Sequence, residues 1–361
     1  MLSRNTYLEV NLKHLARNVK TIIKIHPDYE YYFGVVKADC YGHVGLKTLR
    51  TIMKSGCNYL AVATLDEALD IRKKFYDVPI LCMGVVSRQY IETCLQNNIT
   101  VTIPSIEYLK ELLEDEECED LDFEDLKVHL KIDTGMNRLG LANNNEVLEA
   151  IKLIRNNDIE LEGIYTHIYD AQNEERYLEQ IDRFKKALEG VNLAKIPIIH
   201  IAASEALMNY DKPDFVNGCR LGIIMYGFTT EKILGLPGTF RLISEVVKIN
   251  ELQKGDTLGY NGAFEAEENT KIAVVSIGYA DGVIRKNTGR MVYINDKPYE
   301  IVGNICMDMM FVKVDDEVQV HDEVEVLRDN EHIEEVAKYL DTIPYEILCS
   351  FGKRVPRIYI E

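Results

Sequence analysis

The chain has 361 residues, of which 47% are hydrophobic and 28% are charged, an ordinary balance for a globular protein. This length exceeds one small core, so we expect a large domain and a smaller one. The formal net charge of −18 repels nucleic-acid phosphates and anionic lipid, so neither nucleic acid nor a membrane is an expected partner.

Eight cysteines are scattered along the chain without a Cys-x-x-Cys pair or a zinc-like Cys/His spacing. This pattern is typical of reduced core thiols in a cytosolic protein, and it predicts no metal site. The start of the chain holds no apolar signal core, and no apolar run is long enough to span a bilayer. We therefore expect a cytoplasmic protein.

Strand and helix patterns alternate through the first two thirds of the chain, after an amphipathic helix predicted over 11–24. The predicted strands are 31–36, 59–64, 79–84, 99–103, 127–133, 161–167, 197–202 and 219–226. The predicted helices between them are 45–53, 66–75, 88–96, 106–113, 145–154, 174–188 and a turn at 205–209. This alternation favours a (β/α)8 barrel over an open doubly wound sheet.

From about Gly238 the pattern changes to short β-rich runs separated by turn pairs such as Asn261-Gly262. We therefore predict an α/β fold with an N-terminal (β/α)8 barrel over 1–237 and a C-terminal, mostly β domain over 238–361. The first strand, within 1–10, is a candidate to pack with the C-terminal domain.

Lys37 stands where the predicted strand 31–36 meets a polar turn. Desolvation at a strand end lowers the pKa of an amine, and the neutral amine is a nucleophile. Position alone favours a solvated strand end, but the run 36–43, Val-Lys-Ala-Asp-Cys-Tyr-Gly-His, closely resembles the pyridoxal 5'-phosphate attachment signature of the alanine racemases. The resemblance implies that Lys37 binds this cofactor and acts as a catalytic base, and that the Tyr41 phenol helps to hold its phosphate.

The run 131–140, Lys-Ile-Asp-Thr-Gly-Met-Asn-Arg-Leu-Gly, resembles a second signature of this family. It implies that Arg138 binds the substrate carboxylate, and that Lys131, often carbamylated in relatives, supports Arg138. The segment 163–167 implies that His167 packs against the cofactor's pyridine ring. Residues 168–172 depart from the family pattern, which lines the substrate entrance.

The segment 200–204 resembles a family segment that ends in a phosphate-binding serine, here Ser204. Ser204 also reads as a helix N-cap, and the two roles are compatible because free helix amides favour a phosphate. Ala203 replaces the usual asparagine.

The segment 218–227 resembles the family segment whose arginine, here Arg220, faces the pyridine nitrogen. Arginine stays protonated and does not readily give a proton to that nitrogen, so the resemblance implies a weak electron sink that favours return of the proton to Cα. The amides of Gly222 and Ile223 would hold the phosphate.

In the second domain, the run 258–264 resembles the stretch with the family's second catalytic base, here Tyr260. A free phenol ionises near pH 10, so this base has to be tuned by its neighbours. Tyr260 would act on the face of the intermediate opposite Lys37. In the family this tyrosine comes from the other subunit, which implies a homodimer with shared active sites.

The resemblance covers the whole chain and implies an alanine racemase, a pyridoxal-phosphate-dependent isomerase that interconverts L- and D-alanine by two bases and supplies D-alanine for peptidoglycan. The backbone of Met307 would meet the substrate carboxylate. Asn304 and Lys353 stand where relatives have arginine and tyrosine near the entrance, so a serine or broad-specificity racemase is an alternative.

Two further alternatives come from other classes of protein. A basic amino-acid decarboxylase would require an acid where Arg220 stands. A non-catalytic cofactor-binding protein can consist of the barrel alone, without a domain that carries Tyr260.

Overall fold

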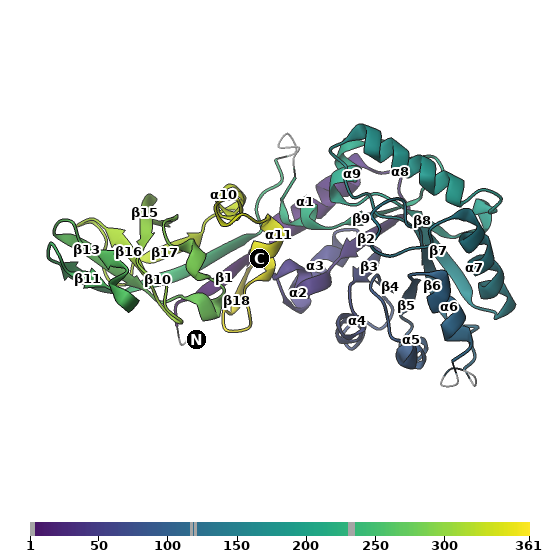
Figure 1. The fold of residues 1–361 in the computed structure, drawn as a ribbon, viewed down its shortest axis with the longest axis horizontal. Coiled ribbons are helices and arrows are strands. Elements are labelled where there is room, and N and C mark those ends of the chain that lie inside the picture. Colours follow the sequence, from purple (N-terminus) through teal and green to yellow (C-terminus); the bar gives the residue numbers. More distant parts are fainter. Residues whose placement is uncertain (1–3, 116–117, 119–120, 230–234) are drawn as a thin grey trace. The chain divides into compact units, whose positions relative to one another are not determined.

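The structure is a computed structural model that describes residues 4–115, 118, 121–229 and 235–361 (Figure 1). It divides into two compact units. The barrel unit comprises Ala16–Cys40 and Thr48–Leu236, and the β unit comprises Met1–Leu15, Tyr41–Lys47 and Pro237–Glu361.

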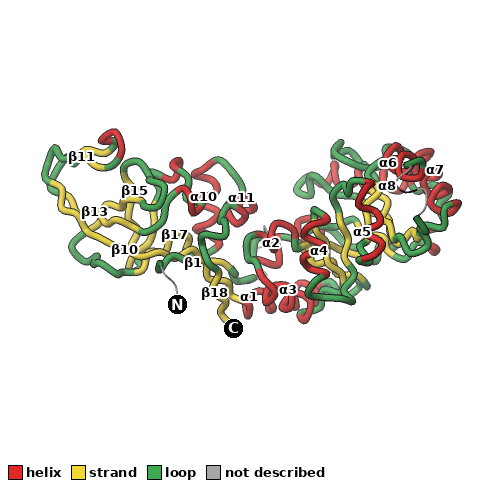
Figure 2. The backbone as a smooth tube through the Cα atoms, turned by 90° about the horizontal axis from the view of Figure 1, so that it is seen from below, coloured by secondary structure: helices red, strands yellow, loops and turns green. Residues whose placement is uncertain are grey.

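The strands of the barrel unit are parallel and close into a ring in chain order from β2 to β9, which confirms the predicted barrel. Helices lie around the yellow strands of the barrel unit in Figure 2, as expected for a parallel ring whose outer face is covered by helices. The strands are β2 (Tyr31–Val35), β3 (Tyr59–Val62), β4 (Ile80–Cys82), β5 (Thr100–Ile103), β6 (Lys127–Lys131), β7 (Glu160–Tyr165), β8 (Ile198–His200) and β9 (Gly218–Leu221).

At the start of several barrel helices, a polar side chain accepts a hydrogen bond from a free backbone amide of the first turn. Thr64 accepts from the amide of Glu67, Ser105 from that of Tyr108, and Asn143 and Asn173 act likewise. The helices up to the end of the barrel are α1 (Leu12–Ile25), α2 (Lys37–Tyr41), α3 (Gly45–Lys54), α4 (Leu65–Arg72), α5 (Ile91–Gln96), α6 (Ile106–Leu113), α7 (Asn144–Asn156), α8 (Glu174–Ala187) and α9 (Ser204–Asn209).

The strand predicted over 219–226 is wrong in its second half. β9 ends at Leu221, and Ile223–Tyr226 forms the short 3-10 helix η4. Every residue of η4 is buried, so its apolar run does not distinguish a buried strand from a buried helix. The correction places Gly222 between the end of a strand and the start of a helix.

The β unit contains an eight-stranded sheet in the order β13-β16-β15-β14-β17-β10-β1-β18. The long strand β10 pairs with β1 and β17 through its first half and with β13 through its second. The strands are β1 (Tyr7–Asn11), β10 (Phe240–Leu252), β11 (Thr257–Leu258), β12 (Phe264–Glu265), β13 (Thr270–Val275), β14 (Met291–Ile294), β15 (Lys297–Val302), β16 (Met310–Val314), β17 (Glu323–Leu327) and β18 (Arg357–Ile360).

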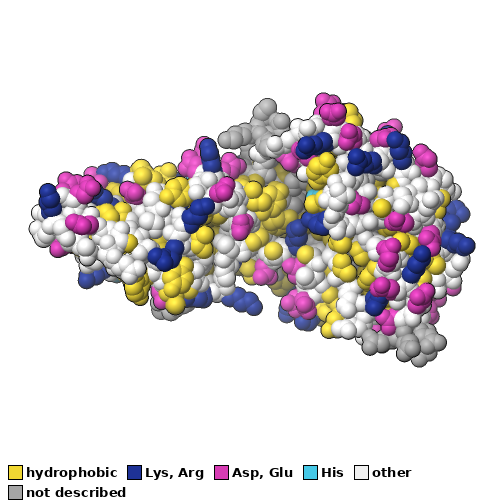
Figure 3. Space-filling model, viewed as in Figure 1, with side chains coloured by type: hydrophobic (Ala, Val, Ile, Leu, Met, Phe, Trp, Pro, Cys, Tyr) yellow, Lys and Arg dark blue, Asp and Glu magenta, His cyan; other side chains and the backbone are white. Residues whose placement is uncertain are grey.

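Two helices, α10 (Asn330–Leu340) and α11 (Pro344–Cys349), belong to the β unit. The helical spacing of apolar residues over 333–340 predicts α10, whereas α11 is too short for a helical period to be recognised. Acidic and basic side chains are interspersed over the face of the molecule shown in Figure 3. Within the described residues, no helix has both the length and the apolar character needed to cross a membrane.

Candidate active site

Lys37 follows β2 at the C-terminal end of the barrel and is half-buried. The next four residues, 38–41, have φ between 51° and 56°, so the chain makes a left-handed turn. A left-handed residue other than glycine costs about 1–2 kcal/mol. Glu67 of α4 stabilises the turn, because its Oε1 accepts from the amide of Ala38 at 2.6 Å and its Oε2 from that of Ala63 at 2.8 Å. The sequence predicted a turn here but not its hand.

Lys131 is the last residue of β6 and is buried. Burial, followed by the charges of Arg138 and Arg220, lowers the pKa of Lys131 to about 8. Its Nζ lies 5.7 Å from the centroid of the Tyr165 ring. Lys131 therefore offers an uncharged amine at mildly alkaline pH.

Arg138 is exposed on a loop that folds back on the end of β6. The amide of Leu141 donates to the carbonyl of Lys131 at 2.8 Å, and the amide of Asp133 donates to the carbonyl of Leu141 at 3.0 Å. Gly140 has a φ of +131°, and a Cβ there would lie 2.4 Å from the nitrogen of Asp133. The loop thus depends on glycine at this position and carries Arg138 close enough to affect Lys131.

His167 lies two residues beyond β7 and is half-buried. Burial and the charge of Arg220 lower the pKa of His167 to about 3, so the imidazole is neutral at physiological pH. Gln180 of α8 fastens this segment: it donates to the carbonyl of His167 at 3.2 Å and accepts from the amide of Tyr169 at 3.1 Å. Sequence reasoning missed Gln180, although a glutamine on the apolar face of α8 is a usable signal.

The segment 168–172, which departs from the family pattern, is tied to the helices beside it. Asp170 forms an ion pair with Arg176 at 2.7 Å, and Gln172 donates to Glu205 at 2.7 Å. Ile168 is buried. The segment 168–172 therefore makes its own contacts with α8 and α9, although its sequence departs from the family pattern.

Arg220 is 2% exposed in β9, and its terminal nitrogens are turned toward neighbouring strand ends. NH1 lies 2.7 Å from Nδ1 of His200, and NH2 donates to the carbonyls of Thr166 and Ile201 at 2.8 Å each. Burial lowers the pKa of Arg220 to about 10, which leaves it charged at neutral pH. Among the described residues no hydrogen-bond acceptor contacts its Nε.

Ser204 is buried, and its hydroxyl accepts from the amides of Gly222 at 3.1 Å and Ile224 at 3.4 Å. The predicted N-cap is wrong, because Ala203 occupies the cap position of α9 without a side-chain bond. The side chain of Ser204 turns away from its own helix to the loop after β9. A hydroxyl and the first amides of η4 meet there, which is a typical arrangement for binding phosphate.

Tyr260 is 70% exposed in the β unit, at the start of the short 3-10 helix η6 (Tyr260–Gly262). Asn304 donates to the carbonyl of Tyr260 at 3.0 Å and accepts a hydrogen bond from Arg285. Asn304 stood out in the sequence only as a departure from the family. In the structure it links the Tyr260 turn to a neighbouring arginine.

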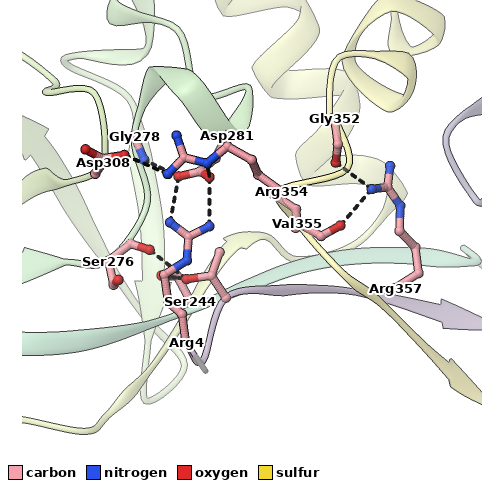
Figure 4. A network of polar contacts seen from close by, with 11 residues as sticks. Arg4, Ser244, Ser276, Gly278, Asp281, Asp308, Gly352, Arg354, Val355 and Arg357 are labelled. Atoms are coloured by element: carbon pink, nitrogen blue, oxygen red, sulfur yellow. Dashed lines mark hydrogen bonds and ion pairs between the residues drawn. The ribbon is translucent and has the colours of Figure 1, made fainter. Parts of the chain in front are cut away.

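Met307 belongs to the same unit, and its carbonyl accepts from the amide of Ala280 at 3.0 Å. The fully buried Asp281 beside this contact accepts two hydrogen bonds from Arg4, at 3.0 and 2.7 Å, and lies 3.5 Å from Nε of Arg354 (Figure 4). Sequence reasoning missed this cluster, because its members lie far apart in the chain. It holds the segment that faces Met307 in place.

Tyr41 is buried in the β unit, with its ring centroid 5.9 Å from that of Tyr345. Gly42 follows with a φ of +76°, and a Cβ there would lie 2.1 Å from the carbonyl oxygen of Leu348. Lys353 is exposed. Of the predicted site residues, the barrel unit contains Lys37, Lys131, Arg138, His167, Ser204, Arg220, Gly222 and Ile223. The charges of Lys37 and Arg138 help to lower the pKa values of Lys131 and His167. Tyr41, Tyr260 and Met307 belong to the β unit.

Two family models match the chain in order. Residues 10–230 match "Alanine racemase, N-terminal domain" and residues 239–359 match "Alanine racemase, C-terminal domain". The alanine racemase of Staphylococcus epidermidis is 36% identical over 370 residues, covering 99% of this chain and 95% of that protein. Alanine racemase 1 of Bacillus subtilis is 34% identical over 371 residues, covering 99% and 94%.

Solved structures are similar over the same length. The alanine racemase of Bacillus anthracis with bound L-Ala-P has a TM-score of 0.91 at 30% identity, covering 100% of this chain and 96% of that one. The alanine racemase of Clostridium difficile has a TM-score of 0.92 at 33% identity, covering 100% and 97%.

Proposed function

This chain belongs to the alanine racemase family, and we propose that it interconverts L-alanine and D-alanine with pyridoxal 5'-phosphate bound at Lys37. The observation that carries the proposal is the match of both family models, in order, along nearly the whole chain. D-alanine made in this way would supply peptidoglycan synthesis.

The residues at the end of the barrel fit this cofactor. The Ser204 hydroxyl and the amides of Gly222 and Ile223 suit a phosphate, and the neutral imidazole of His167 suits the face of a flat ring. Lys37 supplies an amine for the covalent bond. When bound, pyridoxal phosphate supplies the electron sink that acidifies the Cα proton of an amino acid.

Arg220 would determine how strongly the pyridine ring draws electrons. Its guanidinium is a donor only and remains charged at neutral pH, so it does not protonate the ring nitrogen. A weak electron sink favours return of the proton to Cα over side reactions. This supports a racemase over the decarboxylase alternative.

Two groups would move protons at Cα, with Lys37 on one face and Tyr260 on the other. Tyr260 is largely exposed within its own unit, so its phenol is free to enter a site on a second copy of the chain. We therefore include a homodimer with shared active sites in the proposal. Arg138 and the backbone of Met307 would hold the substrate carboxylate.

Lys131 should carry a carbamate whose occupancy rises with pH. The pKa of Lys131 is about 8, so the neutral amine that reacts with CO₂ predominates above that pH and becomes scarce two pH units below it. The anionic product is stabilised by Arg138. Carbon-13 NMR with labelled bicarbonate should show a carbamate signal that grows between pH 7 and 9.

Lys127, at the other end of β6, is the matched control. The signal should vanish in Lys131→Ala and persist in Lys127→Ala. A signal that survives in Lys131→Ala would place the carbamate elsewhere.

The function is tested by incubating the pyridoxal-phosphate-loaded protein with L-alanine or L-serine in D₂O, followed by NMR and chiral chromatography. Deuterium at Cα with build-up of the D-enantiomer is the expected result, faster for alanine than for serine. Equal rates for serine or bulkier amino acids would favour the broad-specificity alternative, which Asn304 and Lys353 motivate. Release of CO₂, or no exchange at all, would refute the proposal.

A further inference from the structure

Four polar side chains form a continuous chain of hydrogen bonds through the interior of the barrel. NH1 of Arg220 lies 2.7 Å from Nδ1 of His200, Nε2 of His200 lies 3.0 Å from Nδ1 of His129, and Nε2 of His129 lies 3.0 Å from Oε2 of Glu162. These residues come from β9, β8, β6 and β7. We name them the Arg220–Glu162 chain.

The donors and acceptors of this chain permit a single direction. A guanidinium only donates, so His200 must accept at Nδ1 and carry its proton at Nε2. That proton points to Nδ1 of His129, which therefore accepts and keeps its own proton at Nε2. The last proton is donated to Glu162. A proton on Nδ1 of His129 would face the proton on Nε2 of His200, so both imidazoles are neutral.

Each end of the chain carries a charge. Burial, followed by the charge of Arg220, holds the pKa of His200 well below its usual range, which agrees with a neutral ring. Burial by itself would raise the pKa of Glu162, but hydrogen bonds from His129 and Tyr59 outweigh it and hold that pKa below its usual range. The carboxylate is thus the counter-charge of Arg220, two imidazoles away.

The backbone is shaped for this contact. Val128 pairs with Leu161 and His129 with Gly163, so a register shift leaves Glu162 without an opposite residue. Such shifts re-aim a side chain. A Cβ on Gly163 would lie 2.5 Å from Cε1 of His129, so glycine at this position makes room for the ring.

Neighbouring side chains hold His200 and Glu162 in place. The His200 ring stacks on Phe33 at a centroid distance of 4.5 Å and on Tyr165 at 4.6 Å. Oε2 of Glu162 also accepts from the hydroxyls of Tyr59 at 2.6 Å and Thr100 at 3.0 Å. The four ring nitrogens of the two histidines and Oε2 of Glu162 therefore each have a fixed partner, as a buried network requires.

We propose that Glu162 is a positioning residue for racemisation: through His129 and His200 it fixes the guanidinium of Arg220 and balances its charge from a distance. The inference rests on the proposed function for the role of Arg220. A carboxylate beside the guanidinium would lie near the ring nitrogen of the cofactor and would stabilise its protonated form. Placing the counter-charge at the far end of the chain keeps Arg220 charged and leaves that nitrogen without an acid.

Glu162→Gln tests the proposal, because an amide has nearly the same shape but donates as well as accepts. His129 then no longer has to keep its proton on Nε2. In long-range ¹H–¹⁵N NMR spectra of the ¹⁵N-histidine-labelled holoenzyme, wild-type His129 and His200 should be protonated only on Nε2. In the variant, part of the population should carry the protons of His129 and His200 on Nδ1, which breaks the hydrogen bond from NH1 of Arg220 to His200, and kcat should fall about tenfold with KM for alanine unchanged.

Two variants serve as controls. Glu160 is exposed two residues earlier on β7, so Glu160→Gln should leave the tautomers and kcat as in wild type. Tyr59→Phe removes one hydrogen bond to the Glu162 carboxylate but leaves that carboxylate as the acceptor for His129. The tautomers of His129 and His200 should therefore also stay unchanged in this variant. A general loosening of the barrel would instead alter the tautomers in Tyr59→Phe.

Protonation of wild-type His200 on Nδ1, or on both nitrogens, overturns the proposal even if Glu162→Gln does not fold. So does a folded Glu162→Gln with wild-type tautomers and wild-type kcat. Because tautomers are read without turnover, these failures are distinct from a wild-type enzyme that does not racemise alanine, which refutes the proposed function.

Discussion

Lys37→Ala should lose the covalent bond to pyridoxal phosphate and lower kcat/KM for alanine racemisation by more than about 10³-fold. The variant removes both the nucleophile that attaches the cofactor and one of the two proton-transfer groups, each of which contributes orders of magnitude. Borohydride reduction followed by mass spectrometry of the peptide around residue 37 measures the bond, and coupled assays in both directions measure the rate.

The exposed Lys54, at the end of α3, provides the control, since Lys54→Ala should keep both the reduced adduct and the activity. Lys37→Arg keeps the positive charge without a nucleophilic amine, and it should be as inactive as the alanine variant. A borohydride-stable adduct that persists in Lys37→Ala would show that another lysine holds the cofactor.

Tyr260→Phe should slow removal of the Cα proton from L-alanine by about 10²- to 10⁴-fold and affect removal from D-alanine far less. The phenol is the proposed proton-transfer group on one face only, and Lys37 still serves the other. Exchange of the Cα proton with D₂O, followed separately for each enantiomer, measures the asymmetry. Equal losses in both directions would mean that Tyr260 is not a face-specific base.

Tyr76 is a matched control, because it is 78% exposed and lies in the loop before the N-terminal end of β4, whereas the candidate site is at the carboxyl ends of the strands; Tyr76→Phe should therefore exchange both enantiomers normally. Shared active sites give a second readout. Co-expressed Lys37→Ala and Tyr260→Phe chains should regain roughly a quarter of wild-type activity, because half of randomly mixed dimers hold one intact site. No recovery would indicate that both groups act within one chain.

Much of the barrel could be predicted from the sequence because hydrophobic periodicity is a local property. The alternation of short buried strands with amphipathic helices predicted the eight-stranded ring, and capping residues such as Thr64 and Ser105 mark the starts of helices. The prediction of secondary structure was wrong at two places where the local sequence pattern fits more than one structure. The buried run after Leu221 was taken as strand, and Ser204 was taken as a cap of its own helix.

The motifs also located the candidate site, because Lys37, Lys131, His167 and Arg220 lie in or just beyond four of the parallel strands, β2, β6, β7 and β9. The carboxyl ends of such strands meet at one end of a barrel, so the order of the motifs predicts that these side chains converge. No such rule gives the hand of the turn after Lys37. That turn depends on Glu67, a residue on the next helix but one.

By itself, then, the sequence determined the order of strands and helices, the family and the residues with recognisable chemistry. Only the tertiary structure decided which distant side chains meet. Glu162 and Arg220 are 58 positions apart in the printed sequence, and nothing in their local patterns links them. They are joined through His129 and His200 because the ring of strands carries their side chains into one buried interior, where each polar atom must find a partner.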